Sequence, residues 1–566
     1  MTKPKTLRVL IAAIALIASS ALLYTFYDRF WYPPDEGNYA HVAQRLLRGE
    51  TLNLQVQDVH PGYISFANAA ALRVFGPDLV SLRYPLVFLG LLQAALLFLL
   101  FPRAAPWHAA IAAVALTALG TIQFLNPTAH WYCLSLVIVL IAVLQFMPRN
   151  GSRLLVAGLL IGTIVLFRQL TGFLVGIGTV AYLLWETDRG VTGGEALLSR
   201  VVTIALIAAL AVYLLFATDV SGFVLFGIWP LIFLVRLFFI PAATNREVLR
   251  TAGWTAAGVC VAVVPLLAYH AAHGSLAAWT EDVGPAAVAL TRLDFFGRSN
   301  FAALVFHAGR QAATGRDAAL LINGAYWVLL PLLAAINGAV VWYVLRSRSA
   351  GEHAALPILA SFYAVVSVHF QIPIYLYYSA GLSLASLLWL GPRLSTLFSR
   401  ATATAALALA ATGVYFHAGQ PASRTITDIL QGRRIESARA ALLPHCSLRV
   451  DPAEGARYVA VVDLIRQHVP ATDAILAIPS NAELYFLSDR RNAFRFYNTA
   501  LGVRDDATLD AVERVLRDDP PKLITFNPTD KYNTPRSLQI MDAVKQRYVL
   551  LGRYEPFDVY VRPSQQ

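Results

Sequence analysis

Charged residues are scarce in this sequence. Asp, Glu, Lys and Arg together make up 14% of its 566 residues, while hydrophobic residues make up 57%. Soluble chains of this length rarely combine so few charges with so much apolar sequence. The composition therefore argues against an ordinary soluble enzyme and indicates a polytopic membrane protein.

Cysteine is also rare, and the motifs of several enzyme classes are absent. The three cysteines, Cys133, Cys260 and Cys446, lie far apart in the sequence. This spacing indicates neither a disulfide framework nor a CxxC metal site. The sequence contains no Gly-rich phosphate loop, no HExxH motif and no cluster of His and Cys. An ATP-driven pump or a metalloprotease is therefore not supported by any motif.

The net charge of +11 is distributed thinly along the chain. Lys and Arg occur singly between apolar runs, and no basic stripe is interleaved with aromatic residues. A nucleic-acid-binding surface is therefore not indicated. The distribution fits instead the rule that the cytoplasmic loops of membrane proteins are basic.

The lengths of the apolar runs predict about thirteen membrane spans. The first, Val9–Tyr24, follows Lys3, Lys5 and Arg8, but bulky residues stand where a signal peptide would need small ones for cleavage. We therefore expect an uncleaved first span and a cytoplasmic N-terminus. The other predicted spans are Leu82–Phe101, Trp107–Leu125, Trp131–Phe146, Leu154–Phe167, Gly172–Trp185, Val201–Ala217, Phe223–Ile240, Ala252–Tyr269, Leu320–Leu345, Ala354–Val368, Ile374–Leu390 and Ala401–Phe416.

Because the chain crosses the membrane once in each span, successive loops lie on alternate sides of the membrane. Loops on the N-terminal side are short and basic, as expected for the cytoplasmic side. Their arginines are Arg103, Arg149, Arg153, Arg189, Arg246, Arg250, Arg346, Arg348 and Arg393. The extracytoplasmic side receives the segments 35–61, 126–130, 168–171, 270–319 and 370–373 and everything beyond Gln420.

The polar segment Trp31–Pro61 follows the first span and contains two adjacent carboxylates, Asp35 and Glu36. Carboxylates beside a bilayer are costly unless they face water or a site, so function is sought here first. Two readings are open. The pair can form the acidic first turn of a helix, with Asp35 as its cap, or Asp35 can act as a catalytic base. The neighbouring polar and aromatic residues are Trp31, Tyr32, Tyr39, His41, Asp58 and His60.

The chain divides into a membrane part, residues 1–420, a linker, 421–436, and a soluble extracytoplasmic domain, 437–566. Within the membrane part, the loop 27–81 carries the acidic pair, and Gly62–Gly76 reads as an interfacial helix. The loop 270–319, with Asp294 and Arg298 near its centre, is a possible lid. No internal repeat is present.

The soluble region has the pattern of a small α/β domain. Buried strands are predicted at Ala474–Ile478 and Lys522–Phe526, and a final strand pair at Tyr548–Tyr554 and Phe557–Val561. Helical spacing is present at Ala456–Gln467, Thr508–Arg517 and Ser537–Gln546.

The acidic pair belongs to a longer pattern. It reads Asp35-Glu36-Gly37-Asn38-Tyr39-Ala40, then His60-Pro61-Gly62, then Arg73-Val74-Phe75-Gly76, then Leu82-Arg83-Tyr84-Pro85. This pattern resembles the start of GT-C glycosyltransferases, in the branch that contains the lipid A aminoarabinose transferase and the protein O-mannosyltransferases. The similarity is close over about the first hundred residues, and the rest of the chain is similar in layout. The resemblance implies a GT-C fold with about thirteen transmembrane helices and a small extracytoplasmic C-terminal α/β domain.

The same resemblance implies a reaction. A sugar would move from a polyprenyl-phosphate carrier to an acceptor glycan, lipid or protein on the extracytoplasmic face, with inversion at the anomeric carbon. Asp35 stands at the position of the family's usual catalytic residue, and a carboxylate there would accept the proton of the acceptor hydroxyl. Glu36 is either a supporting member of the site or part of the helix start. Neither a cofactor nor a divalent metal is expected.

The sequence departs from the family at three places near this pattern. His60-Pro61-Gly62 replaces Lys-Pro-Pro, Asn38 replaces a frequent Arg, and the turn Asn126–His130 lacks an acidic residue that often occurs there. These departures leave the donor sugar and the acceptor open. They leave Asp35 in place.

Six further residues are candidates for binding the donor's phosphate or sugar. Arg168 lies at the extracytoplasmic end of a span, against the basic-inside trend, and would stabilise the negative charge of the leaving phosphate; it can equally be an interfacial arginine that reaches toward water. A lone histidine is more often structural, and a single tyrosine near an interface is more often part of an aromatic belt. The other five candidates are His60, His130, Tyr39, Tyr375 and Tyr378.

A second function class is a lipid or polysaccharide transporter that uses Asp35 to bind an ion or a proton. Transporters usually place ionisable residues near the middle of the bilayer. Here charges within the predicted spans are almost absent, and Arg236 lies near the cytoplasmic end of its span. That pattern favours the enzyme, and the family resemblance implies a bacterial inner membrane with the C-terminal domain in the periplasm.

Overall fold

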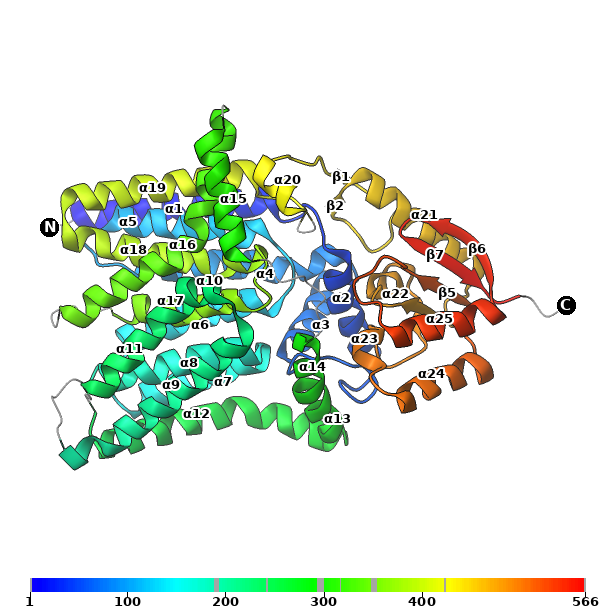
Figure 1. Ribbon diagram of the computed structural model, residues 1–566, viewed down its shortest axis with the longest axis horizontal. Coiled ribbons are helices and arrows are strands. Elements are labelled where there is room, and N and C mark those ends of the chain that lie inside the picture. The colour runs from blue at the N-terminus through cyan, green and yellow to red at the C-terminus, as the bar shows by residue number, and fades with distance from the viewer. Residues whose placement is uncertain are drawn as a thin grey trace.

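The structure is a computed structural model that describes residues 3–187, 193–240, 243–292, 300–315, 317–347, 354–421 and 424–563. A bundle of helices fills one half of the long axis, and an α/β domain fills the other (Figure 1). The chain is thus an α-helical polytopic membrane protein with a small C-terminal α/β domain, as predicted.

Nine helices in the described residues are long and apolar enough to cross a membrane. They comprise α1 (Lys3–Phe26), η1 with α4 (Leu79–Leu82, Tyr84–Leu100), α6 (Ala129–Phe146), η3 with α9 (Gly193–Ala196, Leu197–Ala217), α10 through η4 to α11 (Val220–Gly222, Phe223–Gly227, Ile228–Phe239), α12 (Asn245–Ala272), α16 (Ala318–Arg346), α18 (Ile374–Leu394) and α19 (Thr396–Phe416). The other predicted spans fall on shorter helices: α5 (Pro106–Leu119), α7 (Gly151–Phe167), α8 (Gln169–Trp185) and α17 with η7 (Ala355–Ala364, Val365–Val368). The full count of thirteen crossings stays a prediction.

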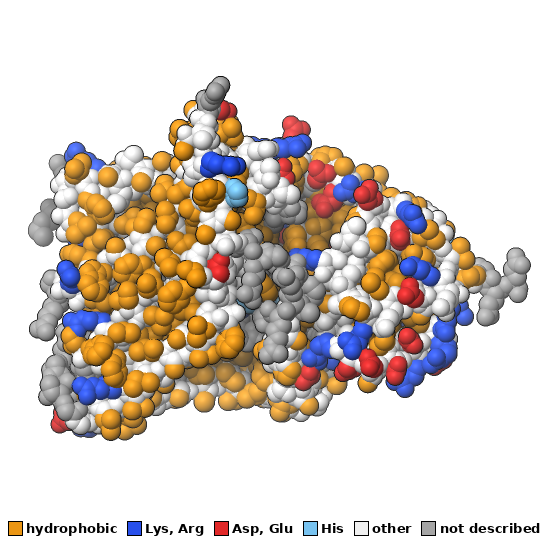
Figure 2. All heavy atoms as spheres, viewed as in Figure 1, with side chains coloured by type: hydrophobic (Ala, Val, Ile, Leu, Met, Phe, Trp, Pro, Cys, Tyr) orange, Lys and Arg blue, Asp and Glu red, His pale blue; other side chains and the backbone are white. Residues whose placement is uncertain are grey.

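The basic loops lie at the N-terminal end of the bundle, away from the C-terminal domain (Figure 1). Arg8 near the start of α1 donates to the carbonyls of Phe101 and Pro102. Buried Arg153 pairs with Glu186, with N to O distances of 2.9 Å. Hydrophobic side chains cover the flank of the bundle, whereas charged ones gather mostly on the C-terminal domain (Figure 2). Arg189 and Arg348 lie outside the described residues, and the side of the membrane that each end faces stays a prediction.

The loop after α1 folds into helices α2 (Pro33–Leu47) and α3 (Tyr63–Phe75). Helix α2 begins with two prolines. Proline has no backbone N–H, but the first N–H groups of a helix have no acceptor within the helix, so no helical hydrogen bond is lost. Gly49 and Gly62 flank the connection with positive φ of 89° and 136°, a backbone region that favours glycine. The helix predicted over Gly62–Gly76 is therefore present as α3.

The C-terminal domain is a five-stranded sheet in the order β4-β3-β5-β7-β6. Strand β3 is parallel to β4 and β5, whereas β7 runs antiparallel to β5 and β6. The strands are β3 (Ala474–Ile478), β4 (Arg491–Asn492), β5 (Leu523–Phe526), β6 (Val549–Tyr554) and β7 (Phe557–Val561). The helices are α21 (Pro452–His468), α22 (Ala482–Ser488), α23 (Thr499–Gly502), α24 (Asp506–Asp518) and α25 (Pro535–Arg547). Every strand and helix predicted for this region is confirmed.

Between the bundle and this domain lie α20 (Ile426–Gln431) and the short antiparallel pair β1 (Ala438–Arg439) and β2 (Arg449–Val450). Strand β2 also holds the end of α1, because the Phe30 amide donates to the Arg449 carbonyl at 2.6 Å and the Arg449 amide donates to the Asp28 carbonyl at 2.7 Å. The start of the region 437–566 is therefore tied to the first loop by backbone hydrogen bonds.

The segment 270–319 contains α13 (Leu276–Glu281), η5 (Asp282–Ala286), α14 (Ala287–Arg292) and α15 (Phe301–Thr314). Asp282 is fully buried and accepts hydrogen bonds from Asn53, Gln57 and Arg495, so it joins this segment to the first loop and to the C-terminal domain. Asp294 and Arg298 lie outside the described residues, and a lid role stays a prediction.

The C-terminal domain docks on the first loop through a shared apolar core. Tyr39 and Leu72 from the loop belong to the same buried cluster as Tyr458 and Phe486 from the domain. Helix α2 packs directly on α22, and at Gly37 an added Cβ would overlap the backbone of Glu483. Glycine is required here because the two helices approach too closely for any side chain.

Replacing Gly37 by alanine should therefore weaken docking, although alanine favours helices over glycine by about 1 kcal/mol. Overpacking at such a contact costs about 1–3 kcal/mol, so the thermal midpoint of the purified protein should fall. The control is Gly253→Ala in α12, where an added Cβ meets nothing within 4 Å; its midpoint should not fall. Equal midpoints for the two variants would contradict the close packing of α2 on α22.

Candidate functional site

Helix α2 presents Asp35 from its first turn. Tyr32 is the N-cap and Pro33 and Pro34 follow, so Asp35 is the third helical residue. Its carboxylate caps no backbone N–H among the described contacts; instead Oδ2 accepts a hydrogen bond of 3.1 Å from Asn126 Nδ2. The helix-cap reading is therefore not supported, and the half-buried side chain turns toward the membrane bundle.

Asn126 belongs to the turn between η2 (Thr121–Gln123) and α6, and its side chain is 1% exposed. This is the turn in which the sequence departs from the GT-C pattern that it resembles by lacking an acidic residue. An amide donor favours the ionised form of Asp35, whereas a second carboxylate would oppose it. Asn126 therefore holds Asp35 in place and supports its negative charge.

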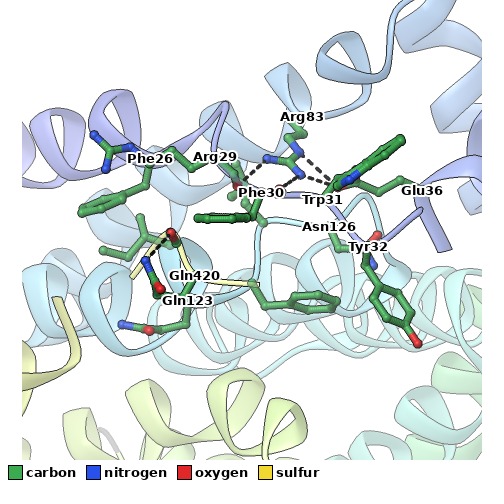
Figure 3. A pocket seen from close by; sticks show the side chains of 14 residues that line it. Phe26, Arg29, Phe30, Trp31, Tyr32, Glu36, Arg83, Gln123, Asn126 and Gln420 are labelled. Carbon is green, nitrogen blue, oxygen red and sulfur yellow. Dashed lines mark hydrogen bonds and ion pairs between the residues drawn. The ribbon is translucent and has the colours of Figure 1, made fainter. Parts of the chain in front are cut away.

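Glu36 faces the other way and forms a buried ion pair with Arg83. Arg83 Nη2 and Nε lie 2.5 and 3.1 Å from Glu36 Oε1, and both side chains are 2% exposed. The same guanidinium donates to the carbonyls of Arg29 and Phe30 (Figure 3). It also donates to the Tyr27 carbonyl. Burial raises the pKa of Glu36 to about 7 against the opposing effect of Arg83. These contacts make Glu36 the residue that attaches α2 to the end of α1 and the start of α4.

A narrow pocket lies beside this ion pair and extends to Asn126 (Figure 3). Its walls combine the aromatic rings of Phe30, Trp31 and Phe124 with polar groups. Asn126 both lines this pocket and donates to Asp35, which does not line it.

His60 is positioned by its neighbour Asp58. His60 Nδ1 lies 2.8 Å from Asp58 Oδ1, and Ser65 donates to the other carboxylate oxygen. Because a carboxylate accepts, Nδ1 carries the proton, and Nε2 is the nitrogen left to meet a ligand. The ring lies 5.6 Å from that of Tyr39, centroid to centroid.

Arg168, His130, Tyr375 and Tyr378 come together from three separate helix ends. The Arg168 guanidinium lies 5.8 Å from the Tyr375 ring and donates to Thr171 at 3.1 Å. His130 stacks on Tyr378 at a centroid distance of 3.8 Å and meets Tyr375 edge-on at 5.1 Å. Within the described part of the chain Arg168 has no carboxylate partner. Its charge is therefore available to an anion.

The charge of Asp35 lies near Tyr39 of the same helix and near the tyrosines of α18. Burial raises the pKa of Asp35 itself, and Lys531, the Asn126 hydrogen bond and His60 oppose that rise. Burial, and then the charge of Asp35, likewise raises the pKa of Tyr39. Seven of the eight residues predicted from the sequence thus lie near one another, whereas Glu36 faces the other way, and their roles stay predictions.

Sequence reasoning missed the contribution of the C-terminal domain. The loop between β5 and α25 brings Lys531 and its neighbour Tyr532 to the start of α2, where Lys531 Nζ lies 3.4 Å from the Tyr32 hydroxyl and its charge opposes the rise in the pKa of Asp35. No motif marks these residues, since they lie almost five hundred positions from Asp35. Asn126 did carry a signal, as a departure from the family pattern, but its partner was visible only in the structure.

Among the residues that the structure describes, no group of three His, Cys, Asp or Glu side chains is arranged to hold a metal ion. The expectation that neither a metal nor another cofactor is used stays a prediction.

No family model matches the chain, and no curated protein matches it. The solved structures that are similar to it include two of ArnT from Cupriavidus metallidurans. The structure bound to undecaprenyl phosphate has 15% sequence identity and a TM-score of 0.42 over 98% of each chain. The structure in the apo state has 15% identity and a TM-score of 0.40, covering 99% of this chain and 98% of that one.

Replacing Arg83 by alanine should destabilise the protein strongly. The change leaves the Glu36 carboxylate and three carbonyls buried without their partner, and breaking a buried ion pair from one side costs about 3–5 kcal/mol. Denaturation of the purified protein in detergent measures the loss. Arg439→Ala is the control, because Arg439 is 67% exposed and lies 3.9 Å from Asp28; an exposed pair contributes at most about 1 kcal/mol.

The double variant Arg83→Met with Glu36→Leu should recover part of that stability, because it leaves no unpaired buried charge. A loss for Arg83→Ala no larger than that for Arg439→Ala would contradict the structural role assigned to the pair.

Proposed function

We propose that this protein is an integral membrane glycosyltransferase. It moves a sugar from a polyprenyl-phosphate carrier to an acceptor hydroxyl on the extracytoplasmic face, with inversion and with Asp35 as the general base. The observation that supports this proposal most directly is the environment of the Asp35 side chain. It is a half-buried carboxylate, hydrogen-bonded by an amide and without an ion pair among the described residues, next to a cluster of Arg168, tyrosines and histidines.

The reaction needs one proton acceptor. As the acceptor oxygen attacks the anomeric carbon, its proton passes to Asp35, and the bond between the anomeric carbon and the phosphate oxygen breaks. A base with a raised pKa suits this step, because a general base acts best when its pKa is near the working pH. The direction of the pKa shift at Asp35 supports this role.

The leaving group is a polyprenyl phosphate monoester, which is a stable anion and needs no strong acid. What favours its departure is positive charge and hydrogen-bond donors where negative charge develops. Arg168 and Tyr375 lie together at the ends of α7 and α18, where a lipid phosphate at the membrane surface would reach them. His60, His130, Tyr39 and Tyr378 would line the space for the sugar.

The sequence pattern supports the same reaction. The resemblance to GT-C glycosyltransferases covers the segment that positions Asp35, including Arg83, for which the structure gives a physical reason. We infer a bacterial inner-membrane enzyme with its C-terminal domain on the periplasmic side. An acceptor glycan, lipid or protein and the lipid-linked sugar are its expected partners.

The position of Asp35 favours an enzyme over a transporter. Transporters usually bind their coupling ions near the middle of the bilayer, between broken helices. Asp35 lies instead on α2, outside the predicted spans and next to the soluble domain. A carboxylate at this depth can meet a water-soluble acceptor as well as a membrane-bound donor.

Asp35→Asn should abolish sugar transfer. Loss of a general base typically lowers a rate about 10²–10⁴-fold, while the amide keeps the shape of the side chain. Purified protein is incubated with a set of polyprenyl-phosphate-linked pentoses and hexoses together with cell-envelope lipids, glycans and proteins. Release of polyprenyl monophosphate is followed by mass spectrometry, and nuclear magnetic resonance gives the anomeric configuration of the product.

The control for this experiment is Asp317→Asn. Asp317 caps α16 through a hydrogen bond of 2.9 Å to the Ala319 amide, so its substitution should affect stability and leave transfer in place. Asp35→Asn should keep its thermal midpoint and its binding of polyprenyl monophosphate. Full transfer by Asp35→Asn would refute the mechanism, and lipid or glycan transport by the wild type without any glycosyl product would support the transporter.

A further inference from the structure

One loop of the C-terminal domain reaches the start of α2. It comprises residues 527–534, between β5 and α25, and Asp530 braces it. Asp530 Oδ2 accepts from the Ser480 hydroxyl at 2.8 Å, and Oδ1 accepts from the Tyr532 amide at 2.9 Å. Asn533 Nδ2 closes the loop with a hydrogen bond of 3.0 Å to the Asn527 carbonyl. The loop therefore presents Lys531 from a fixed backbone.

Lys531 lies over the residue that begins the helix of Asp35. Its Nζ is 3.4 Å from the Tyr32 hydroxyl, 6.0 Å from the centre of the Tyr32 ring and 5.3 Å from the centre of the Tyr532 ring. Cations at such distances are attracted to aromatic faces. Tyr32 is the N-cap of α2, and its carbonyl accepts the Asp35 amide at 3.1 Å. Two aromatic rings thus hold the ammonium group next to the first turn of α2.

Asp35 faces titratable groups from four parts of the chain. From α2 and its N-cap come Tyr32, Glu36 and Tyr39, from the first loop His60, from α18 Tyr375 and Tyr378, and from the C-terminal domain Lys531 and Tyr532. Two of these groups can be positive. His60 is engaged by Asp58, and among these groups Lys531 has the largest effect in favour of the ionised Asp35.

We propose that Lys531 is a positioning residue of the site, whose ammonium group lies over the start of α2 and stabilises the Asp35 carboxylate. The site is then complete only when the C-terminal domain is docked on the first loop. The role of Lys531 in catalysis rests on the proposed function. Its effect on Asp35 can be tested without measuring sugar transfer.

Lys531 Nζ lies 3.4 Å from the hydroxyl of Tyr32, the N-cap of the helix that carries Asp35. A positive charge near a partly buried carboxylate favours its ionised form, by about one pH unit or more in a site of intermediate polarity. Removing the cation should therefore raise the pKa of Asp35, so that a higher pH is needed to ionise it. An arginine at the same place keeps the charge and should keep the pKa.

A hydrophobic carbodiimide tests this directly, because it modifies protonated carboxyl groups. Purified protein in detergent is labelled between pH 5 and pH 9, and fragment ions separate modification of Asp35 from that of Glu36. In Lys531→Met and Lys531→Gln the midpoint of Asp35 labelling should move upward by about one pH unit. Lys531→Arg should keep the wild-type midpoint.

The matched control is Lys522→Met. Lys522 belongs to the same domain but pairs with Asp473 at 2.7 Å, and its substitution should not move the midpoint. Thermal midpoints of all variants confirm that they are folded. Wild-type labelling midpoints in both Lys531→Met and Lys531→Gln would overturn the inference.

Rate measurements distinguish a failure of this inference from a failure of the proposed function. If the protein transfers sugar, the acid limb of its rate profile should move to higher pH in Lys531→Met by the same amount as the labelling midpoint, while the rate at high pH is kept. Absence of transfer in the wild type would remove the proposed function and leave the labelling result to decide on Lys531. Transfer with an unchanged acid limb in Lys531→Met would remove the inference and leave the proposed function.

Discussion

The buried ion pair of Glu36 and Arg83 is the interaction on which the arrangement of the site depends. One guanidinium joins the carbonyls at the end of α1, the carboxylate of α2 and the start of α4. A charge pair with 2% exposure is stable only while every partner is in place, since losing one leaves the other unpaired in an apolar setting. The pair therefore sets the orientation of α2. Because neighbouring residues on a helix point in different directions, anchoring Glu36 turns Asp35 toward Asn126 and the bundle.

Three carboxylates at or near α2 differ in their surroundings and therefore in their roles. Glu36 is paired with a cation. Glu483, beneath Gly37, is fully buried and accepts hydrogen bonds from Tyr458 and Asn481, and burial raises its pKa to about 7. Asp35 accepts a hydrogen bond from the Asn126 amide and is the only one of the three that is half-buried and not fully buried. Chemistry is expected at this third carboxylate, because it alone of the three is partly exposed.

Much of the fold could be predicted because its signals are local. Apolar run length placed all thirteen predicted spans on helices, and alternation with turn residues located β3, β5, β6 and β7 in the C-terminal domain. Parity placed Asp35, Arg168 and Tyr375 at one end of the bundle, where the structure brings them together. Local patterns succeed here because a membrane span and a buried strand each need apolar residues at defined positions within a short stretch of chain.

Other features required the tertiary structure. The sequence by itself determined that the chain is a polytopic membrane protein with an acidic motif on the face of its soluble domain, because hydrophobicity and charge are properties of each segment. Only the tertiary structure decided that Glu36 is anchored by Arg83, that Asp35 is held by Asn126, and that Lys531 of the C-terminal domain contacts Tyr32 at the start of the same helix. Those contacts join residues 47, 91 and 499 positions apart. Their formation depends on how α2 is packed between two domains, which no local pattern of residues encodes.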